Sequence, residues 1–278
     1  MSTVEEDDEQ DLTRKQRREH ARAERKALEE AEAAGAARRK RLIQLGSVAG
    51  VVVVIIVVIL AATGGGGSNG GIQTSKEGKP PPAVAEVTAL LQGIPQNGNT
   101  LGNPKAPVTM EYFADLECPI CKDFTLGALP HLIEKYVRKG QMRIDFRSLE
   151  TATREPETFK TQQAAALAAG KQQKLWYYTE LFYHEQGQEG SEYVTEQYLQ
   201  GLAQQVPGLN LASWSAARNE PQLTNEVAAD AQAASNAGFT GTPSFLIGKT
   251  GGQPQKLEYS SVSDPSSFEA AIDKLLKS

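Results

Sequence analysis

The sequence predicts one α/β domain that carries a long helical insertion and follows a single transmembrane helix. Three observations lead to this fold class. A charge-free apolar run lies near the N-terminus; two strand-like segments enclose a helix-like one; and a long helical stretch separates these from two further strands and a last helix. The 278 residues suffice for one or two domains, and the net charge of −5 gives no sign of a nucleic-acid-binding protein.

Residues 1–41 are almost all polar or alanine, with eleven acidic and eleven basic side chains. A segment that is patterned but nearly neutral is typical of a solvated tail that is partly helical or disordered. An alternative is that its basic end, Arg38 to Arg41, contacts anionic lipid headgroups. We expect this tail to lie in the cytoplasm, because its basic end directly precedes a predicted transmembrane helix.

Residues 42–63 carry no charge, and Gln44 is their only strongly polar side chain. About twenty such residues form a helix of about 30 Å, which matches the hydrocarbon core of a bilayer. The four basic residues before it place the N-terminus inside, so we expect a single-pass plasma (inner) membrane protein whose remainder is extracytoplasmic. A cleaved signal peptide is the alternative, with Ala61 and Ala62 before the cleavage site, but its charged region would be unusually long.

Residues 64–83 are rich in Gly, Ser, Lys and Pro and predict a flexible tether with a stiffer proline end. The globular pattern occupies residues 84–278. In it, residues 108–114 (VTMEYFA) predict a strand, residues 118–140 a helix that Pro130 bends or interrupts, and residues 142–149 a second strand. The sequence thus predicts a β-α-β unit.

The helical insertion covers about residues 155–238, where apolar residues recur at helical spacing and Gly238 is a plausible helix stop. Strands are expected again at residues 243–248 and 255–260. A last helix is expected to begin with Asp264 as its N-cap and Pro265 in its first turn.

Both cysteines of the chain lie in one motif, Cys118-Pro119-Ile120-Cys121, at the junction of the first predicted strand and the following helix. A structural disulfide over two residues would stabilise little, and a zinc site would need ligands from a second chain. A redox pair fits better, because C-x-x-C beside a β-α-β pattern outside the membrane is typical of thiol–disulfide exchange. The inert disulfide and the metal site remain alternatives.

The spacing assigns the two cysteines different roles. Cys118 would lie at the N-terminus of a helix, whose unpaired amides favour a thiolate and lower the thiol pKa. Cys121, one turn later, is expected to be more buried and to attack a mixed disulfide at Cys118. Pro119 suits the first helical turn, and the apolar Ile120 lies between; we expect both to face a substrate.

A second motif, GFTGTPSFLIG, lies far along the chain and places Thr242-Pro243 before an apolar strand. Taken with FADLECPIC and the helical block between them, it resembles the DsbA family of thioredoxin-fold disulfide oxidoreductases. The resemblance covers about residues 91–276 and implies a thioredoxin fold with a helical insertion. It also implies that Pro243 follows a cis peptide bond and faces the cysteines, and that Thr242 binds an extended substrate peptide.

One departure from the family concerns the acid beneath the active site. Many relatives carry Glu six residues before the first cysteine, where this chain has Tyr112, and the neighbouring Glu111 is expected to face the other side of the strand. Asp115 matches an acidic position of relatives, with either a turn-forming or a proton-transfer role. Glu117 is expected to be solvated, and like-charge repulsion from it would raise the Cys118 pKa slightly.

These expectations together describe a membrane-tethered thiol:disulfide oxidoreductase that introduces disulfides into exported, unfolded or reduced proteins. The Cys118–Cys121 disulfide would be its redox centre, with no cofactor or metal, and a membrane quinone-linked thiol oxidase is a partner that the family resemblance suggests. A reductase or isomerase would use the same residues, because the direction depends on the redox potential. A peptide-binding chaperone module is the non-catalytic alternative.

Overall fold

The structure is a computed structural model that describes residues 81–278. The predicted tail, the transmembrane helix and residues 64–80 of the predicted tether lie outside this range. Within residues 81–278, no helix is both long and apolar enough to cross a membrane. The described part opens with helix α2 (Pro82–Leu91), which has Pro82 in its first turn, where a missing amide costs nothing.

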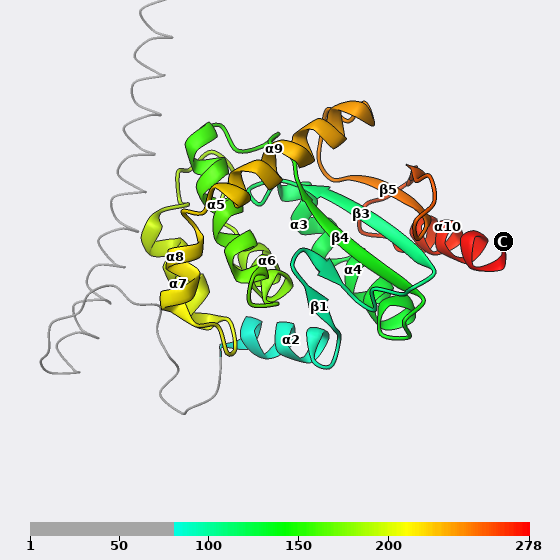
Figure 1. Cartoon of the computed structure of the whole chain (residues 1–278), viewed down its shortest axis with the longest axis horizontal. Helices are drawn as coiled ribbons and strands as arrows, with labels where there is room; N and C mark the ends of the chain where they lie inside the picture. The colour runs from blue at the N-terminus through cyan, green and yellow to red at the C-terminus, as the bar shows by residue number, and fades with distance from the viewer. Residues whose placement is uncertain (1–80) are drawn as a thin grey trace, which may run out of the picture. The chain divides into compact units, whose positions relative to one another are not determined.

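A mixed six-stranded sheet forms the centre of the fold, with strand order β1-β2-β4-β3-β5-β6 (Figure 1). The central strands β3 and β4 are parallel, as a β-α-β unit requires, and the other pairs are antiparallel. The strands are β1 (Gln96–Asn97), β2 (Thr100–Leu101), β3 (Val108–Ala114), β4 (Met142–Ser148), β5 (Ser244–Lys249) and β6 (Gln255–Lys256).

The short hairpin β1–β2 and helix α2 are elements that the sequence reasoning did not identify. The hairpin turns at Gly98, whose φ of 58° is in the left-handed region that glycine adopts without strain. Each of its strands has only two residues, so the sequence shows no alternating pattern there. In the sequence, only the Gly, Asn and Pro residues of this region indicated a turn.

The helix after β3 is divided into α3 (Pro119–Leu126), α4 (Ala128–Leu132) and the π-helical turn η1 (Ile133–Val137). The expected interruption of this helix is present but does not lie at Pro130, which falls in the first turn of α4, where no amide partner is lost. The break falls at Gly127. A Cβ there would lie 2.8 Å from that of Ser263 and 2.5 Å from the Asp123 carbonyl oxygen, so the close approach of the chain near residue 263 requires glycine.

The insertion consists of five helices, and what separates the first two was not predicted. After α5 the chain turns at Gln173, which has a φ of 61°. At the last residue of α5, Gly170, a Cβ would lie 3.0 Å from the Gly98 carbonyl oxygen, so the helix end packs against the hairpin. Gly238, with a φ of 65°, follows α9 as predicted. The helices are α5 (Pro156–Gly170), α6 (Leu175–His184), α7 (Glu196–Gln205), α8 (Leu211–Ala217) and α9 (Pro221–Asn236).

The C-terminal part differs from expectation in two details. Strand β6 ends at Lys256 instead of residue 260, because Tyr259 turns inward and stacks on Phe268, with ring centroids 5.5 Å apart. The last helix, α10 (Ser266–Lys277), begins one residue later than predicted. Asp264 still satisfies its first turn by accepting a hydrogen bond from the Ser266 amide at 2.9 Å.

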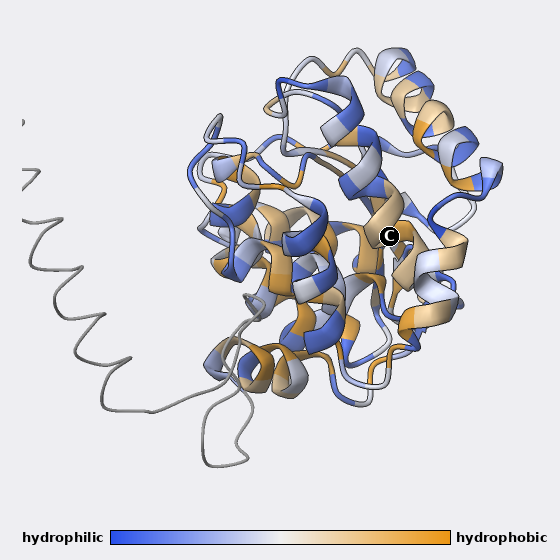
Figure 2. Ribbon diagram, turned by 90° about the vertical axis from the view of Figure 1, so that its left-hand side faces the viewer, coloured by the Kyte–Doolittle hydropathy of each residue, from blue (hydrophilic) through white to orange (hydrophobic). Residues whose placement is uncertain are grey.

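One face of the sheet carries a cluster of aromatic side chains. On this face, Tyr112 of β3 and Phe245 of β5 pack against Phe124 of α3, with ring centroids 4.7–5.3 Å apart. Phe268 of α10 closes this aromatic cluster, at 5.1 Å from Phe245. Hydrophobic segments gather mainly in the interior of the domain, and hydrophilic segments lie mainly toward its surface (Figure 2). The aromatic cluster therefore forms the floor on which helix α3, with its two cysteines, rests.

Candidate active site

Cys118 and Cys121 meet at the N-terminus of α3, as the sequence predicted. Cys118 is the N-cap residue of the helix, and its Sγ accepts a hydrogen bond from the Cys121 amide at 3.4 Å. Both side chains are free thiols; Cys118 is 5% exposed and Cys121 fully buried. The order of burial is the one expected for an outer, attacking thiol and an inner one.

The pKa of the Cys118 thiol is lowered to about 6, well below the usual range for cysteine. The largest cause is a hydrogen bond from the Cys121 side chain; burial acts against it, and the Thr242 side chain and the amides of Cys121 and Ile120 lower the pKa further. These amides are unpaired donors of the first helical turn. Pro119 has no amide to contribute, so the donors begin with Ile120.

Cys121 has the opposite acidity. Burial raises the pKa of its thiol well above the ordinary value, and the hydrogen bond and charge of Cys118 raise it further. The Cys121 thiol thus stays protonated and donates to the Cys118 thiolate. The pair therefore holds one negative charge, on the outer sulfur.

The loop before β5 reaches the cysteines from the far end of the chain. The Thr242–Pro243 peptide bond is cis, as expected, and the Cys118 thiol lies 3.4 Å from the Thr242 carbonyl oxygen. Thr242 is partly exposed while Pro243 is buried. Pro119 and Ile120, which lie between the two cysteines, are exposed, Ile120 by 46%. Together with the partly exposed Thr242 they form an exposed rim beside the reactive sulfur.

The Asp115 carboxylate binds the backbone of a neighbouring loop. It is fully buried, and its carboxylate accepts hydrogen bonds from the amides of Thr151, Ala152 and Thr153 at 2.8–2.9 Å, from the Thr153 hydroxyl at 2.6 Å and from the Glu117 amide at 3.0 Å. Of the two roles left open by the sequence, these bonds support the turn-forming one. The carboxylate fixes the loop after β4 next to the active site.

Glu117 differs from expectation. The prediction that it is solvated is wrong, since it is only 6% exposed and lines a cavity of about 460 Å³ together with Arg154 and Glu192. Burial raises the pKa of its carboxyl, which a hydrogen bond from Thr153 partly offsets. A carboxyl that ionises less readily repels the Cys118 thiolate less.

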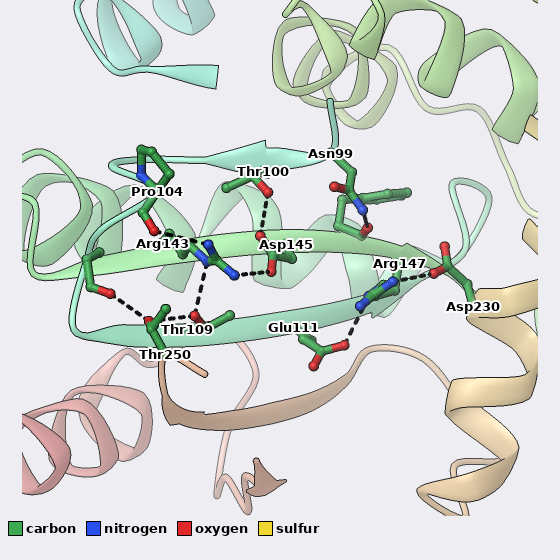
Figure 3. A network of polar contacts seen from close by, with 12 residues as sticks. Asn99, Thr100, Pro104, Thr109, Glu111, Arg143, Asp145, Arg147, Asp230 and Thr250 are labelled. Atoms are coloured by element: carbon green, nitrogen blue, oxygen red, sulfur yellow. Dashed lines mark hydrogen bonds and ion pairs between the residues drawn. The ribbon is translucent and has the colours of Figure 1, made fainter. Parts of the chain in front are cut away.

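Tyr112 and Glu111 face opposite sides of β3, as the strand period requires. The Tyr112 hydroxyl lies beneath the cysteine helix, 3.3 Å from the Cys121 carbonyl oxygen. The Glu111 carboxylate is on the other face and accepts from Arg147 at 3.0 Å, and Arg147 also donates to Asp230 of α9 at 2.9 Å (Figure 3). Glu111 therefore takes no part in the cysteine site.

Several site residues were not found from the sequence. Gln186, after α6, donates to the carbonyl oxygens of Leu116 and Cys118 at 2.7 and 3.2 Å, and so holds the segment that enters the motif. The Thr151 and Thr242 hydroxyls lie 2.5 Å apart. A glutamine after a helix and a threonine in a loop give no signal in sequence. Within residues 81–278, no three His, Cys, Asp or Glu side chains gather so as to hold a metal ion.

Comparisons with known proteins agree with this geometry. A family model described as Thioredoxin matches residues 96–274. A probable disulfide bond formation protein D of Bacillus cereus is 26% identical over 181 residues, which are 64% of this chain and 78% of that protein. Its counterpart in Bacillus anthracis is 24% identical over 179 residues, with the same shares covered.

Solved structures show the same fold. Oxidised BdbD from Bacillus subtilis superposes with a TM-score of 0.56 and 20% identity, covering 66% of this chain and 98% of that one. Alpha-DsbA1 from Wolbachia pipientis gives 0.54 and 22%, covering 67% and 92%.

A thioredoxin fold that presents two thiols of unequal acidity at a helix N-terminus defines the class of thiol:disulfide oxidoreductases. The family match spans more than half of the chain, so the chain belongs to the thioredoxin family. It is a thiol:disulfide oxidoreductase with a DsbA-like fold, and the predicted resemblance is confirmed.

Proposed function

We propose that this oxidoreductase introduces disulfide bonds into exported proteins, with Cys118 and Cys121 as its reacting pair. The observation that carries the proposal is the placement of Cys118 Sγ at the N-terminus of α3, where the Cys121 amide donates to it and the Cys118 pKa is lowered to about 6. A stabilised thiolate favours the reduced form of the pair, and a pair that prefers to be reduced takes electrons from other dithiols. The names of the Bacillus relatives, disulfide bond formation proteins, support the same direction.

The exchange proceeds in two steps. A substrate thiolate attacks Cys118 Sγ of the Cys118–Cys121 disulfide, the bond between the two cysteines breaks, and Cys121 leaves with the electron pair and takes up a proton. A second substrate thiol, after losing its proton, then attacks the substrate sulfur of the mixed disulfide and releases the Cys118 thiolate. The substrate gains one disulfide and loses two electrons and two protons, and the protein's pair is reduced.

The exposed rim is the proposed contact surface for the substrate. Ile120 offers an apolar side chain and Pro119 a rigid neighbour beside the sulfur, and both are exposed. Thr242, whose carbonyl oxygen lies 3.4 Å from Cys118 Sγ, and the neighbouring Pro243 would align the main chain of an extended peptide. A reduced or unfolded protein supplies such a peptide, since its cysteine is not yet enclosed in a core.

The predicted anchor gives the proposal its location. Residues 42–63 would hold the protein in the plasma membrane with its N-terminus in the cytoplasm, and residues 64–83 would let the catalytic domain reach exported chains. The disulfide itself is the redox centre, so the proposed chemistry needs no further cofactor or metal. Reoxidation needs an electron acceptor, and a quinone-linked thiol oxidase in the same membrane is the proposed one.

The test is disulfide transfer by the oxidised full-length chain in detergent micelles to a reduced, unfolded substrate protein. We expect the wild-type protein to transfer its disulfide and the Cys118→Ser variant to transfer none. Equal transfer by both would refute the roles assigned to the cysteines.

A redox titration of the full-length pair against glutathione tests the direction separately. We expect an oxidising potential. A strongly reducing one would favour the reductase or isomerase instead, and activity that survives replacement of both cysteines would favour a peptide-binding chaperone.

A further inference from the structure

A buried pair of phenols lies directly beneath Cys121. Tyr112 of β3 is 1% exposed and Tyr183 of α6 is fully buried, and their hydroxyls are 3.5 Å apart. The Tyr112 hydroxyl is also 3.3 Å from the Cys121 carbonyl oxygen and 3.3 Å from the Thr125 hydroxyl. Polar atoms are rare in such an aromatic floor, so their placement under the inner cysteine calls for a reason.

The hydrogens of this pair can be counted. The Tyr183 hydroxyl donates its single hydrogen to the Asp115 carbonyl oxygen at 3.2 Å, so it offers only lone pairs to Tyr112. The acceptors left for the hydrogen of Tyr112 are the Tyr183 and Thr125 hydroxyl oxygens, the Cys121 carbonyl oxygen and the Cys121 side chain. The three distances to oxygen, 3.3–3.5 Å, exceed the usual 2.7–2.8 Å or so of an O–H···O bond. This hydrogen is therefore free to turn toward a stronger acceptor.

Three other polar side chains of this region have partners elsewhere. The Asp115 carboxylate is occupied by the loop at residues 151–153, and the Tyr259 hydroxyl donates to the Pro243 carbonyl oxygen at 3.0 Å. Glu111 points to the opposite face of the sheet, where Arg147 binds it. The Asp115 backbone and the Thr242 side chain already lower the pKa of Cys121 by hydrogen bonding, and the Tyr112 hydroxyl is a further donor for its sulfur.

We propose that Tyr112 donates a hydrogen bond to the Cys121 thiolate at the moment when this thiolate leaves the disulfide, with Tyr183 as a positioning residue. The inference rests on the proposed function and specifies its first step. A substrate thiolate bonds to Cys118 Sγ, and the electron pair of the broken bond moves to Cys121 Sγ. The Tyr112 hydroxyl turns toward it, and the thiolate then takes a proton from water. Tyr112 keeps its own proton throughout.

Its chemistry differs from that of a carboxylic acid at the same place. Burial raises the pKa values of both phenols well above their ordinary value, so they stay protonated and act as donors, not as proton acceptors. A hydrogen bond to a charged sulfur is stronger than one to a neutral carbonyl. The phenol thus stabilises the charged leaving group more than it stabilises the disulfide, which is the condition for a rate effect.

The experiment measures reduction of the oxidised full-length chain by dithiothreitol, with Tyr112→Phe compared against Tyr178→Phe. Tyr178 is a matched control, because its phenol is equally buried and donates to the Leu199 carbonyl oxygen within the helical insertion. We expect Tyr112→Phe to slow reduction about tenfold, the loss of one charge-assisted hydrogen bond. Tyr178→Phe should leave the rate unchanged. Tyr183→Phe should slow reduction less than Tyr112→Phe.

A second readout separates this role from a structural one. The pH at which the alkylation rate of Cys118 in the reduced protein is half-maximal should stay the same in Tyr112→Phe, because the groups that lower the pKa of Cys118 are Cys121, Thr242 and the first-turn amides and not this phenol. A Tyr112→Phe protein that is reduced as fast as Tyr178→Phe would overturn the proposal, as would a parallel shift in alkylation. Dithiothreitol probes the disulfide whichever direction the protein serves, so the result does not depend on the transfer assay.

Discussion

The two faces of the central sheet carry opposite chemistry, although adjacent residues of one strand build them. On the face of Tyr112, aromatic rings and two phenols lie beneath the cysteines. On the face of Glu111, the partly exposed side chain of Arg147 joins two carboxylates (Figure 3). The difference teaches that the strand period keeps the Glu111 carboxylate away from the inner thiol, where a nearby carboxylate would change the energy of a thiolate.

The largest loss of stability is expected on replacing Asp115, which directly follows β3. Asp115→Ala should destabilise the protein by about 3–5 kcal/mol, because it leaves the buried amides of the loop at residues 151–153 without acceptors. Urea unfolding measures this, with Asp123→Ala on the exposed side of α3 as the control. A loss no greater than that of the control would mean that Asp115 does not hold the loop.

The polar face can be broken without touching the cysteines. Asp230→Ala should destabilise the protein by about 2–3 kcal/mol, since it removes a buried partner of Arg147 and the acceptor of the Ser148 amide. The glutathione equilibrium of the Cys118–Cys121 pair should stay as in the wild type. A shifted equilibrium would show that the two faces are coupled and would contradict the separation of the polar face from the cysteine site.

The cysteine face should respond to pH near neutrality. With a pKa of about 6, Cys118 of the reduced protein should be about nine-tenths thiolate at pH 7, as measured by its alkylation rate from pH 4 to 9. Because the folded pKa lies below the unfolded one, the unfolded chain binds more protons between these values. The contribution of Cys118 to the stability of the reduced protein should therefore rise from about pH 6 toward the pKa of the unfolded thiol and be lost as pH falls through 6, while the raised pKa of the buried Glu180 acts in the opposite direction.

The oxidised protein supplies the control for this pH dependence. It lacks the Cys118 titration but retains Glu180, whose burial raises its pKa to about 8 and whose effect is common to both forms. Below the ordinary cysteine pKa, where Cys121 is protonated in both the folded and the unfolded chain, the difference between the unfolding free energies of the two forms should thus isolate Cys118. Parallel curves for the reduced and oxidised proteins would contradict the low pKa.

Much of the fold followed from local sequence. The strand prediction for residues 108–114 matched the observed bounds of β3, and Gly238 marked the end of α9. The errors arose where packing between distant segments decides. The break at Gly127 depends on the approach of Ser263, and the early end of β6 depends on Tyr259 packing against Phe268.

The candidate site also has features that local sequence predicted and features that depend on distant segments. The spacing of Cys118 and Cys121 predicted their place on a helix, their unequal burial and the low pKa of the outer thiol. Glu117 was misjudged, because nothing near it in the chain shows that the loops around residues 154 and 192 cover it. Tyr183 and Gln186 were missed, since each reaches the motif from about 65 residues away or more.

The sequence by itself determined where the reacting sulfurs lie and, through the parity of β3, that Tyr112 and not Glu111 faces them. These features are local, because helix caps and strand periods act over a few residues. Only the tertiary structure decided what those groups meet: the loop that occupies Asp115, the phenol of Tyr183, and the threonine pair beside Cys118. Such contacts join segments up to 124 residues apart, and no local pattern specifies them.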